Sequence, residues 1–351
     1  MRSSGLGAVV AALALATTPA LIPPAAAAAP AACAWTPTLL PRPAGIDSAA
    51  VTAADSQGGF AGDGDVWGPW GSSSHHALRW RDGQVTVYAD PPGMTDPSVA
   101  GVNRGGTVVG HAQTLTAGDH AFRSRDGKLE ALPEPAGAQE SWATGINDNG
   151  DIVGHVGTHF QEDVMSYTVH TAVLWPASAP GTVVKLSAGL PTTGQTKAKG
   201  IDQDGTVLIE HYPKRTDAFT ATSLRLWRAG TARTLTPPAG MDRVEGAAIS
   251  NGRVAGRATP GDAEGIGVLW EQNGTPLRLG TSWRAGSVNR SGQVTGSLPD
   301  LANGVWQLTR LVATLKGSLG VNVSADDGSV AGWSRTSDDA GRGEPTVWRC
   351  R

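Results

Sequence analysis

Three oxygen-bearing side chains alternate in the stretch GINDNGDIVGH, residues 145–155, where Asn147, Asn149 and Asp151 surround Gly150. Calcium loops also place oxygen ligands at alternating positions and use a glycine for the sharp turn. A tight turn between two strands would use the same residue types. The Asx side chain bonds nearby backbone there, and glycine accepts a positive φ. The rest of the chain decides between these interpretations.

The stretch recurs along the chain, and each copy keeps an apolar residue, an Asn, Asp or Ser, and a glycine. Clear copies are GVNRGGTVVGH at 101 and SVNRSGQVTGS at 287; worn copies are AADSQGGFAG at 53, GIDQDGTVLI at 200, AISNGRVAG at 248 and SADDGSVAG at 324. The central glycines are Gly58, Gly106, Gly150, Gly205, Gly252, Gly292 and Gly328, spaced by 48, 44, 55, 47, 40 and 36 residues. Seven units of this length are typical of propeller blades.

Cations in the equivalent turns argue against a shared calcium site. Arg104, Arg253 and Arg290 stand there, and these three copies carry no carboxylate in the turn. We therefore interpret the stretch as a strand-connecting turn, and we predict no metal and no cofactor. A calcium ion confined to one unit, such as the opening copy or Asp202 and Asp204, is the alternative.

A second motif follows each glycine turn, as in HALRWRDG at 76, HAFRSRDG at 120 and SLRLWRAG at 223. An alternating strand, a glycine-containing turn and another short strand predict a second hairpin in each unit. Six tryptophans recur at one position of this motif: Trp80, Trp175, Trp227, Trp270, Trp306 and Trp348. We expect them to fill the space between neighbouring blades, where a large ring buries much area.

The sequence thus predicts an all-β fold, a seven-bladed β-propeller of four-stranded antiparallel blades. Six or eight blades are the alternatives, because the later units are worn and short. HALRW and HAFRS, preceded by GVNRGGTVVG and GINDNGDIVG, resemble the HAF-repeat family of extracellular bacterial proteins over most of residues 46–351. The resemblance implies a propeller-like repeat fold and secretion. It implies no established reaction, so it assigns no catalytic residue.

The first residues are typical of a secretory signal peptide. Arg2 precedes an apolar stretch that Pro19 interrupts, and a run of small residues follows. We predict a signal peptide over residues 1–32, a single propeller domain over 33–351, and a secreted, extracellular, monomeric protein without a membrane anchor. Lipidation of Cys33 is the alternative. The formal net charge of −3 leaves no basic face for nucleic acid.

The two ends of the domain complete one hairpin. The segment ACAWTPTLLPRPAG, from residue 32, matches the last strand of the second hairpin, whereas PTVWRC, from residue 345, matches its first strand. We expect these strands to pair and to close the ring, which removes a free sheet edge. Cys33 and Cys350 would then lie within disulfide reach, and an oxidising compartment favours the bond. Two unrelated thiols are the alternative.

Candidate binding residues lie in loops that depart from the repeat. The first loop, residues 62–76, carries Trp67, Trp70, His75 and His76, whose aromatic faces and hydrogen-bonding groups suit a sugar or a peptide. A tryptophan pair folded back on the blade is the alternative there. His159 lies in the loop 157–171 and His211 in the loop 209–223, and a solvated hairpin extension is the alternative for both.

No catalytic motif stands out, and we predict no catalytic residue. The chain has no G-x-S-x-G elbow, no H-E-x-x-H and no phosphate loop. SADDGSVAGW at 324 resembles a sialidase Asp-box only in part. We therefore expect a secreted binding or interaction module without intrinsic catalysis, whose ligand is a polysaccharide, a peptide or a secreted protein. A secreted propeller hydrolase or lyase acting on polysaccharide is the alternative, because carboxylates from different blades can meet.

Intact mass spectrometry of the secreted protein, with and without reductant and thiol label, tests the predicted termini. We expect cleavage between Ala26 and Ala32 and a mass two hydrogens below that of the reduced chain, with no thiol labelled. Two labelled thiols, or a lipid on Cys33, would contradict the predicted disulfide.

Overall fold

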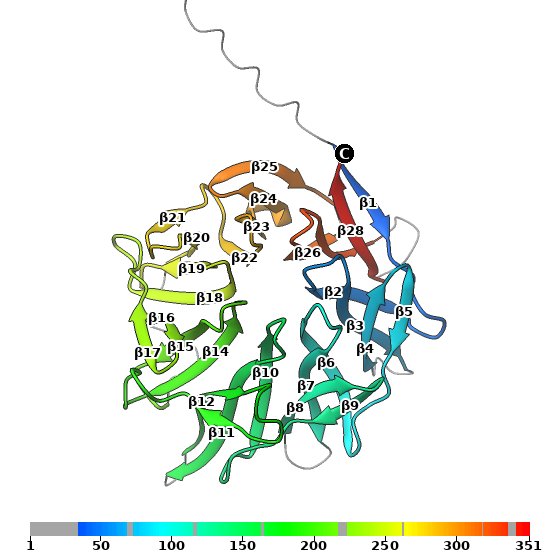
Figure 1. The fold of residues 1–351 in the computed structure, drawn as a ribbon. Helices are drawn as coiled ribbons and strands as arrows, with labels where there is room; N and C mark the ends of the chain where they lie inside the picture. Colours follow the sequence, from blue (N-terminus) through cyan, green and yellow to red (C-terminus); the bar gives the residue numbers. More distant parts are fainter. Residues whose placement is uncertain are drawn as a thin grey trace, which may run out of the picture. The chain divides into compact units, whose positions relative to one another are not determined.

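The computed structural model describes residues 34–68, 73–114, 118–162, 165–216, 223–261, 263–317, 319–335 and 342–351. They belong to one compact unit, Cys33–Arg351. Seven four-stranded antiparallel sheets follow one another around a ring (Figure 1). The predicted seven-bladed propeller is confirmed. Residues 1–32 lie outside the described ranges, so the signal peptide stays a prediction.

Each blade runs from an inner first strand to an outer fourth strand. Blade 1 contains β2 (Ser48–Ala54), β3 (Phe60–Trp67), β4 (Ser73–Arg81) and β5 (Gln84–Val87). Blade 2 contains β6 (Met94–Val102), β7 (Val108–Thr114), β8 (Gly118–Arg125) and β9 (Lys128–Ala131). Blade 3 contains β10 (Glu140–Ile146), β11 (Ile152–Glu162), β12 (Met165–Trp175) and β13 (Val184–Lys185).

The remaining blades keep this order. Blade 4 contains β14 (Gln195–Ile201), β15 (Val207–Tyr212), β16 (Ser223–Arg228) and β17 (Thr231–Thr234). Blade 5 contains β18 (Arg243–Ser250), β19 (Arg253–Thr259), β20 (Ile266–Trp270) and β21 (Pro276–Arg278). Blade 6 contains β22 (Arg284–Val288), β23 (Gln293–Ser297), the 3₁₀ turn η2 (Pro299–Leu301), β24 (Asn303–Gln307) and β25 (Arg310–Leu315). Blade 7 contains β26 (Leu319–Ser324), β27 (Val330–Ser334), β28 (Glu344–Cys350) and β1 (Trp35–Leu39).

The stretch at residues 145–155 forms the turn between β10 and β11. Asn147 Oδ1 accepts the backbone N–H of Asp151 at 2.9 Å, and Gly150 has a φ of 88°. Asn289 Oδ1 accepts the N–H of Gln293 at 2.9 Å in the same place of blade 6. The interpretation as a strand-connecting turn is confirmed, because the Asx side chain satisfies backbone donors within its own turn.

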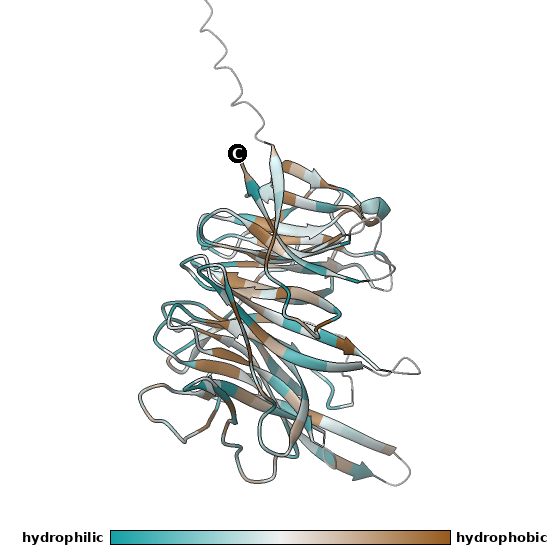
Figure 2. Cartoon of the chain, turned by 90° about the vertical axis from the view of Figure 1, so that its right-hand side faces the viewer, coloured by the Kyte–Doolittle hydropathy of each residue, from teal (hydrophilic) through white to brown (hydrophobic). Residues whose placement is uncertain are grey.

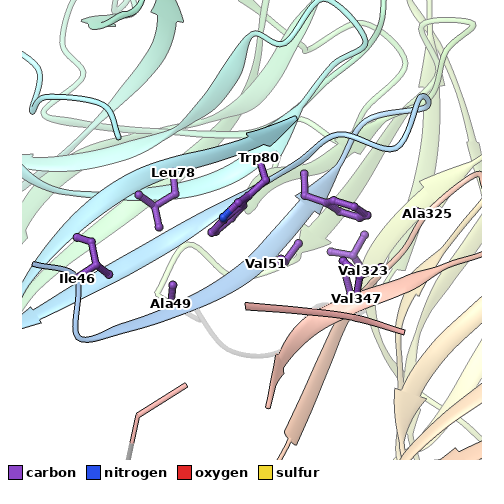
Figure 3. Packing of buried hydrophobic residues seen from close by; sticks show 10 residues of the cluster. Ile46, Ala49, Val51, Leu78, Trp80, Val323, Ala325 and Val347 are labelled. Atoms are coloured by element: carbon purple, nitrogen blue, oxygen red, sulfur yellow. The ribbon is translucent and has the colours of Figure 1, made fainter. Parts of the chain in front are cut away.

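The repeated tryptophans lie on the third strands and face the preceding blade. Five of the six are buried, and Trp227 is partly buried. Trp80 and Leu78 of blade 1 belong to one buried cluster with Val323 and Val347 of blade 7 (Figure 3). Trp80 Nε1 also donates to the carbonyl of Pro41 at 2.8 Å, in the connection that follows the fourth strand of blade 7. The predicted position between blades is confirmed.

The indole N–H makes this link at several joints of the ring. Trp175 donates to the Pro133 carbonyl at 2.7 Å, and Trp270 donates to the Thr236 carbonyl at 2.8 Å. Burying a tryptophan is favourable only if its N–H finds an acceptor, and the connection between blades supplies one. Hydrophobic residues lie mainly in the strands, whereas the turns are largely hydrophilic (Figure 2).

The ring is closed by strands from opposite ends of the domain. β1 pairs antiparallel with β28, which places Trp35 opposite Cys350 and Leu39 opposite Thr346 (Figure 1). The last blade thereby gains a fourth strand, as in the other six blades. The predicted closure is confirmed. Cys33 lies outside the described residues, so its disulfide with Cys350 stays a prediction.

No helix within the described ranges is long and apolar enough to cross a membrane.

Replacing Trp270 with alanine is expected to lower the free energy of unfolding by about 3–5 kcal/mol, because a fully buried ring and its hydrogen bond are removed. Urea unfolding monitored by circular dichroism measures the loss. Trp283→Ala is the matched control, since Trp283 is 45% exposed and its loss leaves the core intact. Equal losses in the two variants would contradict the role of Trp270 in joining blades.

Candidate functional site

One position of the repeat carries a different side chain in almost every blade. It follows the last glycine of the motif, on the second strand, and its occupants are Asp63, His111, His155, Glu210, Arg257, Ser297 and Trp333. The preceding residue is glycine in all blades except blade 4, because a Cβ there would collide with the backbone of the first strand, as at Gly62 and Gly154. The scaffold fixes the glycine and leaves the next residue free to vary.

A bulge accompanies this position in every blade. The register of the first strand shifts between Val51 and Ala53 in blade 1, and between Ala143 and Gly145 in blade 3. Bulges bend a strand and redirect the neighbouring side chains. The variable side chains are thus displayed on the second strand of each blade, opposite the bulge of the first strand.

Acidic side chains at this position connect one blade to the next. Asp63 Oδ1 accepts the N–H of Val99 at 2.7 Å, and Glu210 Oε1 accepts the N–H of Gly246 at 2.8 Å. Burial raises the pKa of Asp63 to about 7, although the Val99 N–H favours the charged form. Asp63 can therefore exchange a proton near neutral pH.

Histidines take the position in blades 2 and 3 and form an aromatic cluster in blade 3. The rings of Trp142 and His155 stack with centroids 5.0 Å apart, and His170 meets His155 edge-on at 5.2 Å. Burial lowers the pKa of His155, and it lowers that of His170 to about 4, with a further contribution from the Lys197 ammonium. Both imidazoles are neutral at pH 7.

A groove lies where blades 5, 6 and 7 meet at the ends of their second strands. Two adjoining cavities of about 320 and 450 Å³ share Trp283 and Ser297 as lining residues. The first is also lined by Arg257 and Glu264, and the second by Trp333. We call this pair of cavities the Trp283 groove. Three of the seven variable positions contribute to it.

The Trp283 groove combines exposed aromatic faces with charged groups. Trp283 is 45% exposed, and Leu301 in η2 is 87% exposed. The Arg335 guanidinium lies over the Trp333 ring at 5.2 Å from its centroid. Arg257 Nε is buried and has no hydrogen-bond partner among the described residues. Such a surface suits a ligand with apolar faces and hydroxyl-rich edges.

The loop predicted from the sequence, residues 62–76, belongs to blade 1. Like the Trp283 groove, it lies where a second strand ends, here β3. Trp67 is 43% exposed, with the Arg342 guanidinium 5.9 Å from its ring centroid. His75 Nδ1 lies 2.8 Å from the Asp65 carboxylate, and His76 is partly buried. Trp70 lies outside the described residues.

The other predicted residues are distributed over blades 3 and 4. His159 is exposed and its Nε2 lies 3.4 Å from the Glu140 carboxylate. His211 is buried, and its Nε2 lies 3.0 Å from the Thr193 carbonyl. The structure therefore does not bring the predicted residues together in one place, and their part in binding stays a prediction.

Sequence reasoning missed Trp283 and Arg257, the residues of the groove. For Arg257 the available signal was its place after the repeat glycine, because that residue changes from copy to copy while its surroundings persist. Trp283 does not stand at that position. Within the described ranges, no group of three or more His, Cys, Asp or Glu residues is placed to hold a metal ion.

No protein-family model matches this chain, and a search of curated proteins finds no match. Among solved structures, an acylaminoacyl peptidase from Pyrococcus horikoshii is similar, with a TM-score of 0.54 and 11% identity over 86% of this chain. This chain spans 51% of that peptidase. The β-propeller domain of the Trilobed protease from Pyrococcus furiosus has a TM-score of 0.54 and 10% identity, over 86% of this chain and 95% of that domain.

These similarities show the propeller fold alone, because so few residues are identical. The Pyrococcus furiosus domain has an open velcro topology, whereas β1 and β28 close the ring here. A lectin from Aleuria aurantia also aligns, at 12% identity over 88% of this chain and 96% of that chain, with a TM-score of 0.35. A TM-score this low supports no conclusion about what the present protein binds.

Asp63→Asn is expected to change how stability depends on pH. The folded-state pKa of Asp63 is raised from 3.8 to about 7, so its contribution is complete below about pH 4 and is lost as pH rises through 7. The wild type should therefore lose stability relative to the variant across this window, by at most about 1.4 kcal/mol per pH unit.

Urea unfolding at several pH values measures this difference. Direct comparison with the variant is needed because His155 and His170, with lowered pKa values, contribute with the opposite sign in both proteins. Parallel pH profiles for wild type and variant would rule out a raised pKa at Asp63.

Proposed function

We propose that this chain is a secreted binding module without intrinsic catalysis, and that it binds a polysaccharide at the Trp283 groove. One observation carries the ligand class: two tryptophans line adjoining cavities that also contain charged hydrogen-bonding groups. Secretion is supported by the residue pattern of 1–32 and by the resemblance to HAF-repeat proteins. The proposal includes a monomer and a Cys33–Cys350 disulfide, and the pairing of β1 with β28 supports the bond.

The Trp283 groove leaves apolar side-chain area exposed to water, and a ligand could cover it. An exposed indole face and the exposed Leu301 side chain keep apolar area in contact with solvent. A sugar ring that covers Trp283 would remove that area from water, while its hydroxyls remain free to bond Glu264 and Arg257. The buried Nε of Arg257 also lacks a partner among the described residues, and a ligand oxygen would supply one.

A second candidate function, hydrolysis or lyase cleavage of a polysaccharide, is favoured by Asp63. A carboxyl group whose pKa is about 7 can act as a general acid near neutral pH. Asp65 and His75 are close enough to act on its charge, and both influence its pKa. Release of reducing or unsaturated sugar ends by wild type, abolished in Asp63→Asn, would establish this function over the binding module.

Trp283→Ala is expected to weaken polysaccharide binding by about tenfold or more, because stacked aromatic residues dominate such contacts. Affinity electrophoresis through gels that contain soluble cell-wall or plant polysaccharides measures retardation. Leu311→Ala is the matched control, since Leu311 is also 45% exposed and does not line the groove.

Trp67→Ala tests the site predicted from sequence in the same gels. Loss of retardation with Trp67→Ala and not with Trp283→Ala would move the ligand to blade 1. Absence of retardation of the wild type by every polysaccharide, together with retention on immobilised secreted proteins or peptides, would replace the carbohydrate ligand with a peptide or protein.

A further inference from the structure

Blade 2 breaks the series of buried tryptophans. Its third strand, β8, carries Ser124 where the other six blades carry tryptophan. The small hydroxyl accepts the N–H of Val108 at 2.8 Å and lacks the bulk of an indole ring. A cavity of about 570 Å³ opens there, and Ser124 is one of its lining residues.

Residues of blades 1, 2 and 3 line this cavity. Blade 1 contributes Arg79, Thr86 and Tyr88, and blade 2 contributes Ser124 and Arg125. Tyr88 occupies the place that leucine takes after the fourth strands of several other blades, with the same backbone bond to the third strand. Its ring is buried with Val108 and Phe122 in one apolar cluster, so it fills part of the tryptophan space. The cavity remains beside it.

Arg79 is a cation without a protein partner among the described residues. Its Nε is buried without a hydrogen-bond acceptor, and no ion pair of Arg79 is found in the described part of the chain. The guanidinium lies against Gly106, where a Cβ would collide with it. Glycine at this turn thus leaves room for the cation. A buried donor without an acceptor is unfavourable, and a ligand oxygen would relieve that cost.

The same arginine is paired in the neighbouring blade. Arg123 stands opposite Glu130 in the ladder of β8 and β9, and Nε lies 2.7 Å from the carboxylate. In the ladder of β4 and β5 the residue opposite Arg79 is Thr86. Blade 1 therefore keeps the arginine of this repeat and lacks its acid. The difference concerns a single side chain on equivalent backbones.

We propose that this cavity, hereafter the Arg79 cavity, binds an oxyanion, a carboxylate or phosphate group of a small ligand. A guanidinium presents donors in a fixed fork that matches such groups. The bound oxyanion takes the place of the carboxylate that Glu130 supplies to Arg123. Arg123 and Arg125 add cations to the wall, but both are paired with Glu130, at 2.7 and 3.5 Å, and Asp126 is an acid in the same lining. Arg79 is therefore the cation left for the ligand.

The Arg79 cavity is separate from the Trp283 groove. It is lined by Gly106 and Gly150, which belong to turns between first and second strands. The Trp283 groove is lined by Ser297 and Leu301, beyond the opposite end of a second strand. The two sites also lie on different blades, so failure of one does not decide the other.

Isothermal titration calorimetry at low ionic strength tests the site with glucuronate, inorganic phosphate and glucose. We expect glucuronate, phosphate or both to bind with one site per chain, and glucose not to bind there. Binding of glucuronate alone identifies a carboxylate ligand, and binding of phosphate alone identifies a phosphate ligand. Binding of neither anion would overturn the proposal.

Two variants assign the anion to Arg79. Arg79→Gln should weaken binding by about tenfold or more, because a charged donor is lost. Thr86→Glu supplies the missing acid opposite Arg79 and should weaken binding to the same extent while preserving the fold. Thr38→Glu is the matched control, since Thr38 stands at the equivalent exposed position of β1, opposite Val347.

Circular dichroism and urea unfolding confirm that each variant is folded. If both Thr86→Glu and Arg79→Gln bind the anion as tightly as the wild type, the anion binds elsewhere and the proposal is overturned.

Discussion

The contact between neighbouring blades is the interaction on which the rest of the structure depends. A four-stranded sheet leaves apolar area exposed on its faces, and it becomes stable only when another blade covers that area. The third-strand tryptophans supply much of the cover, and Trp80, Trp175 and Trp270 also donate their N–H to the connection that leaves the preceding blade. Because every blade needs a neighbour on both sides, the ring must close, and the pairing of β1 with β28 closes it.

A repeated scaffold separates what must be constant from what can vary. The turn glycines and the glycine before the variable position are held by backbone geometry, since a Cβ would collide or a positive φ is required. The next residue meets no such demand. The same backbone thus presents Asp63 in one blade, Arg257 in another and Trp333 in a third. Both candidate sites lie where the repeat departs from its pattern. The Trp283 groove has additional aromatic and charged groups, and the Arg79 cavity lies where blade 2 lacks the tryptophan.

Equivalent positions acquire different electrostatics from their neighbours. Burial raises the pKa of Asp63 to about 7 and lowers that of His155, because it disfavours the charged form of each group. The inner strands thereby carry neutral imidazoles in blade 3 and a titrating carboxyl in blade 1. A binding module tolerates these groups as polar links between blades. A catalyst would use Asp63 itself, so its carboxyl group would be needed for activity and not only for the contact between blades.

The sequence by itself determined the number of blades, the four strands of each, the turns and the strand that completes the ring. These features are periodic or local: a glycine turn, a hairpin and a tryptophan recur in each unit, so neighbouring copies reveal them. Only the tertiary structure decided the sites. Arg257, Trp283 and Trp333 are far apart in the chain and meet because three blades converge. His211 looks like a loop residue in the sequence, yet packing buries it. Arg79 and Arg123 look alike in sequence, and only the strand opposite each shows that one has an acid and the other does not.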